Sequence, residues 1–485
     1  MCSIKKDTIT GVKWSAIERF SVQAVTFVIG IILARLLTPE DYASIAMLSI
    51  FMAISSAFID SGMANALIRK DNRTAEDCSV VFYFNIFVSI LMYVILFFLA
   101  PFVASFYNLP ILTSILRVIA FNLIIGSLFS IQTVLFTIKI NFKILAVISL
   151  VSAIFSGAIA IIMAYNGFGV WSLVWQGIIS SVIRLILSWC LSSWRPMLCF
   201  SKESFKNLFS FASKLLVSGL LHTIYSNIIS LIIGKYGTPS ELGYYSRGDS
   251  LANFPSTNIN GILQRVSFPI FAKIQGDGNV LIGAYRKYIK YSSLIIFFLM
   301  CLLVALAKPL VIFLLTEKWL NAILLLQILC FAYMFDHICS INLNLLQVKG
   351  RSDLFLKLEI IKKTISIVIL IISIPFGVVA ICISRVIYTQ IAVYINTYYT
   401  GKLFNVGYFT QVKDFINYFV FSIIACIPAF ILTFFIENNI LLIIIGGLTS
   451  ISIYFALLYL RRDVIFMVDI FPLLRKYLKF NFRHS

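Results

Sequence analysis

Ionisable side chains that stand inside long apolar stretches are the residues of this sequence best suited to chemistry. Eight of them interrupt such stretches: Glu18, Arg19, Asp60, Arg184, Lys214, Asp336, His337 and Arg385. A charge in the middle of a lipid bilayer costs on the order of 2.5–3.5 kcal/mol on insertion scales, so such residues usually face a polar cavity or a partner. Arginine in such a place suits phosphate oxygens, whereas aspartate and histidine suit cation or proton coupling.

Six of these residues are candidates for contact with a polar substrate along a path through the protein: Arg19, Lys214, Arg385, Arg184, Asp336 and His337. Each has a structural alternative. The side chains of Arg19 and Lys214 lie near helix starts and can snorkel to the membrane surface. The two deeper arginines can each form an ion pair within their own half of the chain. Asp336 and His337 can form a structural hydrogen bond.

Four further charged residues fall at the ends of apolar stretches and predict an outer gate closed by ion pairs: Arg35, Asp41, Arg247 and Asp249. Loop charges that are simply solvated are the alternative.

Motifs for catalysis, metals or cofactors are missing from the sequence. The nine cysteines form no CxxC pair and the three histidines lack metal-ligand spacing. There is no P-loop, no HExxH and no Gly-x-Ser-x-Gly. We therefore expect no metal, no cofactor and no enzymatic activity.

The composition indicates a polytopic membrane protein. Of 485 residues, 60% are hydrophobic and 12% are charged, whereas soluble domains carry about 25% charged residues. The net charge of +19 comes from cations in short loops between apolar stretches. That distribution favours contact with membrane lipids and argues against nucleic acid as a partner.

The apolar stretches predict an all-α fold of about fourteen transmembrane helices, because each is close to the roughly 20 residues that span a bilayer. Their ranges are 14–36, 43–66, 79–105, 112–138, 144–165, 168–193, 207–235, 248–271, 287–315, 320–348, 355–375, 377–400, 411–436 and 439–460. Lysine and arginine concentrate in the loops after even-numbered helices, which predicts that both termini are cytoplasmic. The basic tail, 461–485, is expected on the anionic inner leaflet.

Three pairs of similar segments, separated by 200 to 210 residues, indicate an internal duplication. They are 32–43 with 232–243, 116–121 with 326–331, and 168–170 with 376–378. An even number of helices separates the copies, so the repeats are parallel. We expect two facing six-helix lobes, 1–200 and 206–405, followed by two additional helices, 411–460.

Several motifs carry a resemblance to a known family: 11–16, 32–42, 60–62, 66–69, 165–171, 242–245 and 345–351. With these motifs the chain resembles the polysaccharide transporters, the Wzx-type flippases, and is most similar to their WzxC-like branch. That family belongs to the multidrug/oligosaccharidyl-lipid/polysaccharide (MOP) superfamily, whose MATE-like fold has two six-helix lobes around a cavity.

The resemblance implies transport by alternating access in the bacterial inner membrane. The substrate it implies is an undecaprenyl-diphosphate-linked oligosaccharide, flipped from the cytoplasmic to the periplasmic leaflet for O-antigen, capsule or exopolysaccharide synthesis. Other polysaccharide assembly proteins are possible partners.

Two other functions are compatible with parts of the sequence. A cation-coupled small-molecule or multidrug exporter of the same superfamily would use a buried carboxylate such as Asp60 or Asp336. A membrane polysaccharide polymerase would need a large outer loop, and no predicted outer loop exceeds roughly a dozen residues.

Overall fold

The computed structural model describes residues 20–60, 62–70, 72–198 and 201–472. Within these ranges every regular element is a helix and there is no strand, which confirms the all-helical fold class. The chain forms two compact units, Met1–Gly243 and Tyr244–Ser485.

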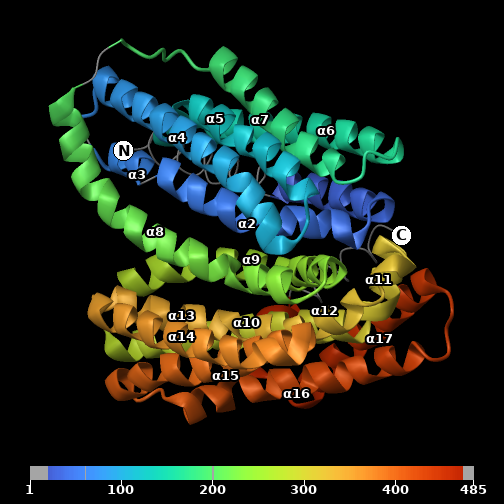
Figure 1. Cartoon of the computed structure of the whole chain (residues 1–485). Helices are drawn as coiled ribbons and strands as arrows, with labels where there is room; N and C mark the ends of the chain where they lie inside the picture. The colour runs from blue at the N-terminus through green and yellow to red at the C-terminus, as the bar shows by residue number, and fades with distance from the viewer. Residues whose placement is uncertain (1–19, 61, 71, 199–200, 473–485) are drawn as a thin grey trace, which may run out of the picture. The chain divides into compact units, whose positions relative to one another are not determined.

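The first unit is a bundle of long helices (Figure 1). Helix α4 packs against α5, α5 against α7, and α7 against α6, while α8 packs against α2, α3 and α4. The elements are a helical segment, Phe20–Leu36, and then α2 Pro39–Asp60, α3 Met63–Arg69, α4 Ala75–Tyr107, α5 Ile111–Ile138, α6 Phe142–Tyr165, α7 Trp171–Leu191 and α8 Lys202–Tyr236.

Helix α9, Pro239–Lys273, begins in the first unit and continues into the second. In the second unit α10 packs against α16, α16 against α17, and α14 and α12 against α15 (Figure 1). The elements are α10 Gly278–Ala305, α11 Ala307–Leu315, η1 Glu317–Trp319, α12 Ala322–Tyr333, α13 Asp336–Val348, α14 Ser352–Ser373, η2 Ile374–Phe376, α15 Gly377–Phe404, α16 Tyr408–Leu432, α17 Asn439–Leu460 and η3 Phe466–Ile470.

Eleven helical stretches of the described chain are long and apolar enough to cross a membrane, so the protein is a multi-pass membrane protein. The predicted number of fourteen is not confirmed. Two predicted spans fall in one stretch, Asp353–Phe404, and Phe20–Leu36 is a shorter apolar helix. Helix α9 is not among the eleven, because polar and charged residues interrupt its apolar sequence.

Three predicted spans are broken into two helices each. The span 43–66 breaks at Gly62, whose φ of 77° belongs to the left-handed region that favours glycine. The span 287–315 breaks at Leu306, between α10 and α11. The span 320–348 breaks between α12 and α13. No long polar segment separates the two helices at any of these breaks, so hydropathy alone did not reveal them.

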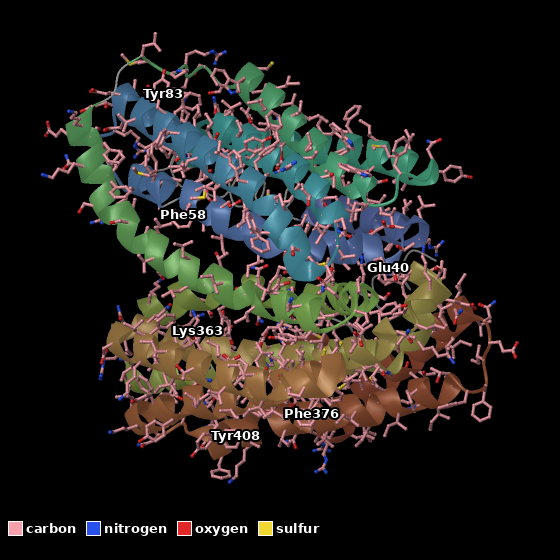
Figure 2. The ribbon with its side chains drawn as sticks, viewed as in Figure 1. Glu40, Phe58, Tyr83, Lys363, Phe376 and Tyr408 are labelled. Atoms are coloured by element: carbon pink, nitrogen blue, oxygen red, sulfur yellow. The ribbon has the colours of Figure 1, made fainter. Side chains whose placement is uncertain are left out.

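The outer surface of the helices carries many apolar side chains. Phe98 and Phe102 of α4 are 69% and 71% exposed, and Phe376 of η2 is 74% exposed. Figure 2 labels Phe376 among the side chains of the second unit. Rows of exposed phenylalanine would be costly in water, whereas acyl chains solvate them well. This surface fits a lipid environment.

The two copies of the repeated Thr-Pro segment adopt the same turn. The Asp41 carboxylate accepts hydrogen bonds from the Thr38 backbone N–H (2.9 Å) and hydroxyl (3.1 Å). The Glu241 carboxylate accepts the equivalent bonds from Thr238, at 2.7 and 3.0 Å. Each turn caps the first turn of a long helix, α2 or α9, and satisfies backbone donors that the helix leaves free.

The borders of the predicted lobes remain a prediction. Helices α16 and α17, expected outside the duplication, belong to the second compact unit. In the predicted tail, residues 473–485 lie outside the described residues.

Candidate functional site

Helices α9, α12 and α15 of the second unit bring together a cluster of polar side chains. The guanidinium of Arg385 donates to the Asp249 carboxylate at 2.7 Å. The Tyr333 hydroxyl donates to the same carboxylate oxygen at 2.8 Å, and the guanidinium lies 4.3 Å from the centroid of the Tyr333 ring. The side chains of Arg385 and Asp249 keep 25% and 27% of their surface exposed. The arginine is therefore neutralised locally, but it remains accessible to a competing anion.

The four residues predicted for the outer gate have different surroundings. Asp249 was predicted as a gate residue, and its observed partners are Arg385 and Tyr333 of its own unit. Asp41 caps its own helix through Thr38. Arg35 is exposed and Arg247 is half-buried. The gate formed by these four residues remains a prediction.

Asp336 and His337 open α13 with different surroundings. His337 is fully buried, and its Nε2 forms a hydrogen bond with the Ser293 hydroxyl of α10 at 3.0 Å. Its ring also packs edge-on against Phe297, with centroids 5.4 Å apart. Asp336 is the first residue of α13 and is partly exposed. The contacts of His337 fit the structural alternative considered for it.

In the first unit, Arg184 of α7 donates through its Nε to the buried Ser152 hydroxyl of α6 at 3.2 Å. This contact ties two neighbouring helices. Lys214 lies in α8, but its side chain lies outside the described part of the structure. Arg19 and Glu18 lie outside the described residues altogether.

A buried amide network in the second unit was missed by the sequence analysis. The Asn342 side chain accepts hydrogen bonds from Tyr285 (2.8 Å) and Thr400 (2.9 Å) and donates to Gln411 (2.9 Å). These residues come from α10, α13, α15 and α16, and Asn342, Thr400 and Gln411 are fully buried. The network joins four helices by hydrogen bonds that are strong in an apolar environment.

A second missed feature is the bidentate ion pair between Arg286 of α10 and Asp414 of α16. The two N–O distances are 2.7 and 2.8 Å, and Lys290 lies 3.3 Å from the same carboxylate. The predicted span 287–315 left Arg286 outside any helix. Asp277 was the available signal, because its carboxylate accepts from the N–H groups of Asn279 and Val280 and so begins α10 earlier.

Comparison with known proteins identifies related chains. The profile of a family described as polysaccharide biosynthesis protein matches residues 32–324. The teichuronic acid biosynthesis protein TuaB of Bacillus subtilis is 26% identical over 356 residues, which cover 73% of this chain and 74% of TuaB. The lipopolysaccharide biosynthesis protein WzxC of Escherichia coli is 24% identical over 369 residues, which cover 74% of each chain.

Among solved structures, the lipid II flippase MurJ in an inward closed conformation has a TM-score of 0.76. The match covers 93% of this chain and 99% of MurJ at 14% identity. At that identity the likeness shows a shared fold.

Proposed function

Because this chain belongs to the polysaccharide biosynthesis protein family, we propose that it flips lipid-linked oligosaccharides across the bacterial inner membrane. Family membership confirms the resemblance seen in the sequence motifs, and WzxC is among the relatives. The observation that carries the proposal is the family match over residues 32–324 in a chain that shares its fold with a lipid II flippase.

The proposed substrate is an undecaprenyl-diphosphate-linked oligosaccharide, which moves from the cytoplasmic to the periplasmic leaflet. We also propose that both termini are cytoplasmic, as the distribution of lysine and arginine in the loops predicts. Alternating exposure of a path to the two sides of the membrane carries the headgroup while the lipid tail stays in the bilayer. No covalent bond forms or breaks, so the protein acts as a transporter and not as an enzyme. Other polysaccharide assembly proteins would supply and use its substrate.

The diphosphate is proposed to follow cationic side chains. Arg385 is the best-described candidate, because its guanidinium is partly exposed and arginine matches phosphate oxygens through two parallel hydrogen bonds. A diphosphate would compete with Asp249 for that guanidinium. Arg19, Arg184 and Lys214 remain candidates for the same path, as do Asp336 and His337 for contacts with the sugars.

A deletion strain of the source bacterium tests this proposal. We would measure on which side of the inner membrane the undecaprenyl-linked oligosaccharide accumulates after adding back wild type, Arg19→Ala, Lys214→Ala or Arg385→Ala. The exposed Arg351 provides the matched control, Arg351→Ala. Immunoblots of the membranes verify equal amounts of each variant.

The proposal predicts build-up on the cytoplasmic side, relieved by wild type and by the control but not by the three path variants. Rescue by all three variants would retain the flippase and discard the cationic path. If the lipid-linked unit reached the outer leaflet in the deletion strain, the protein would not be its required flippase, and a small-molecule exporter would become the better proposal.

A further inference from the structure

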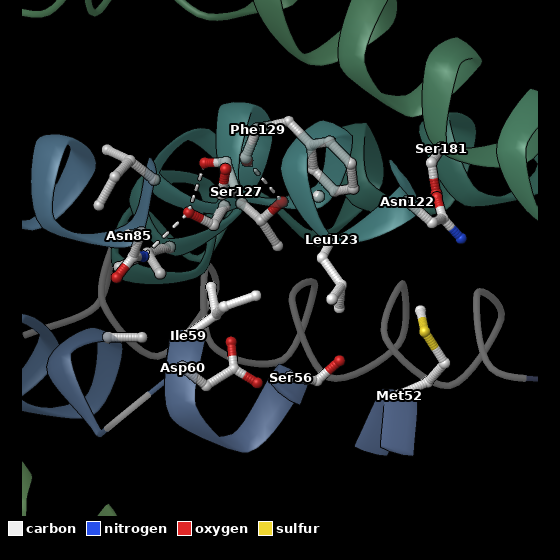
Figure 3. Close-up of a pocket in the computed structure, with 16 residues that line it drawn as sticks. Met52, Ser56, Ile59, Asp60, Asn85, Asn122, Leu123, Ser127, Phe129 and Ser181 are labelled. Atoms are coloured by element: carbon white, nitrogen blue, oxygen red, sulfur yellow. Dashed lines mark hydrogen bonds between the residues drawn. The ribbon is translucent and has the colours of Figure 1, made fainter. Parts of the chain in front are cut away.

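Helices α2, α4, α5 and α7 of the first unit line a pocket of about 380 Å³ (Figure 3). That volume lies in the range of small-molecule sites, about 300–1,000 Å³. In Figure 3 the side chains of Asp60 and Ser56 rise from α2 toward Leu123 and Ser127 of α5. Arg184, Asp336, His337 and Arg385, four of the residues proposed for the substrate path, are not among the described residues that line it.

The pocket presents hydrogen-bond acceptors that have no protein donor. Asn85 is 3% exposed, and its amide nitrogen donates to the Ser130 hydroxyl at 3.2 Å. Its amide oxygen accepts no hydrogen bond from any described residue, and the same holds for the amide oxygen of Asn122. A buried oxygen without a donor costs roughly 1–3 kcal/mol. Two such oxygens in one pocket therefore point to a ligand that supplies donors.

Three hydroxyl groups of α5 that line the pocket have carbonyl acceptors within α5. Ser127 donates to the Ile124 carbonyl at 2.8 Å, and Ser130 donates to the Ser127 carbonyl at 3.0 Å. Thr133 donates to the Phe129 carbonyl at 3.3 Å. Hydroxyls that donate to these carbonyls present lone pairs to the pocket, where a ligand can donate to them.

The described residues that line the pocket carry charge of one sign. Among the described residues that line it, Asp60 is charged and there is no lysine or arginine. A carboxylate with no cation beside it repels phosphate and uronic acid groups and attracts hydroxyl or ammonium donors. Leu123 and Phe129 supply an apolar wall on which a sugar ring can pack.

We propose that this pocket binds a neutral or amino sugar of the translocated oligosaccharide and excludes a sugar that carries a carboxylate. The inference rests on the proposed flippase function and adds a selectivity to it. The diphosphate binds outside this pocket, along the proposed cationic path. The pocket determines which sugar can be translocated with it.

Reconstituted full-length protein in liposomes tests the selectivity with two matched probes. One is undecaprenyl diphosphate bearing an N-acetylglucosamine–glucose disaccharide, and the other bears N-acetylglucosamine–glucuronic acid. We expect wild type to flip the neutral probe about tenfold faster, since placing like charges together costs at least that factor. Asp60→Asn should lower the ratio of the neutral-probe rate to the acidic-probe rate, because the acidic probe then moves faster.

Two further variants sharpen the test. Asn85→Asp adds a second carboxylate to the pocket and should raise the ratio of the neutral-probe rate to the acidic-probe rate. Glu76→Gln removes an exposed acid of α4 outside the pocket and should leave the ratio unchanged. Thermal unfolding of each variant checks that it is folded.

The outcomes separate the pocket from the proposed function. Equal rates for both probes with wild type would overturn the pocket proposal and leave the flippase intact, whereas no movement of either probe would overturn the flippase itself. Each assay is repeated with potassium in place of sodium. If Asp60→Asn abolished a sodium dependence and left the probe ratio unchanged, the pocket would be a cation site and our proposal would be wrong.

Discussion

Removal of the Arg385 guanidinium is the perturbation whose effect the structure defines best. Arg385→Ala leaves the Asp249 carboxylate with the Tyr333 hydroxyl as its remaining observed donor. Asp249→Ala leaves the guanidinium stacked on Tyr333 without its counter-charge. Either single change exposes an uncompensated charge to an apolar environment, whereas the double variant removes both charges together.

The magnitude follows from the exposure of the pair. Breaking a fully buried pair costs about 3–5 kcal/mol, whereas exposed pairs contribute about 0–1 kcal/mol. The side chains of Arg385 and Asp249 are 25% and 27% exposed, so we expect a loss of about 2–3 kcal/mol for each single variant. At roughly 2–4 °C per kcal/mol for a unit of this size, Tm falls by about 4–12 °C.

Thermal unfolding of the purified protein in detergent measures this effect, with Arg351→Ala as the control. Arg351 makes a bidentate pair with Asp353 at 2.7 and 2.9 Å, but the two side chains are 43% and 60% exposed. That pair should contribute less than about 1 kcal/mol. The double variant should lose less than the sum of the two single losses. Strict additivity, or equal shifts for Arg385→Ala and the control, would refute the reasoning.

Five other substitutions have defined outcomes in the same unfolding measurement. Gly243→Ala should lower the free energy of unfolding by about 1–3 kcal/mol, because its Cβ would lie 2.1 Å from the Pro39 carbonyl oxygen. A Cβ at position 283 meets no atom within 4 Å, so Gly283→Ala should not destabilise the protein. Asn342→Leu should cost about 1–3 kcal/mol, because Tyr285, Thr400 and Gln411 lose their common partner; an unchanged Tm would contradict the network. Asp414→Asn should cost about 1–2 kcal/mol, since it breaks a bidentate pair whose arginine is 41% exposed. Arg286→Lys should have a lower Tm than wild type, because lysine cannot form the bidentate contact.

The sequence predicted the features that depend on local composition. Long apolar stretches predicted the all-helical fold class. The similar segments 32–43 and 232–243 indicated a repeat, and the structure contains the same turn in both, at Thr38 and Thr238. In these turns the donor and acceptor are three residues apart, so the sequence holds all the information needed.

Contacts between distant residues could not be predicted in this way. Asp249 and Arg385 are 136 positions apart, and their pairing depends on how α9 and α15 pack. The role of Asp60 depends on polar side chains of α4 and α5 that the sequence did not connect to it. The break before α13 falls at Met334 and Phe335. Both residues are apolar, and neither is a glycine or proline that would signal the end of a helix.

The most direct test of the central claim is movement of the substrate by the purified protein alone. Fluorescent undecaprenyl-diphosphate oligosaccharide would be placed in both leaflets of proteoliposomes, and the fraction digested by a membrane-impermeant glycosidase would be measured over time. Our account predicts that the inner-leaflet fraction becomes accessible with the protein and stays protected in empty liposomes. Persistent protection of that fraction in the presence of folded protein, with every probe lipid tested, would contradict the assignment as a flippase.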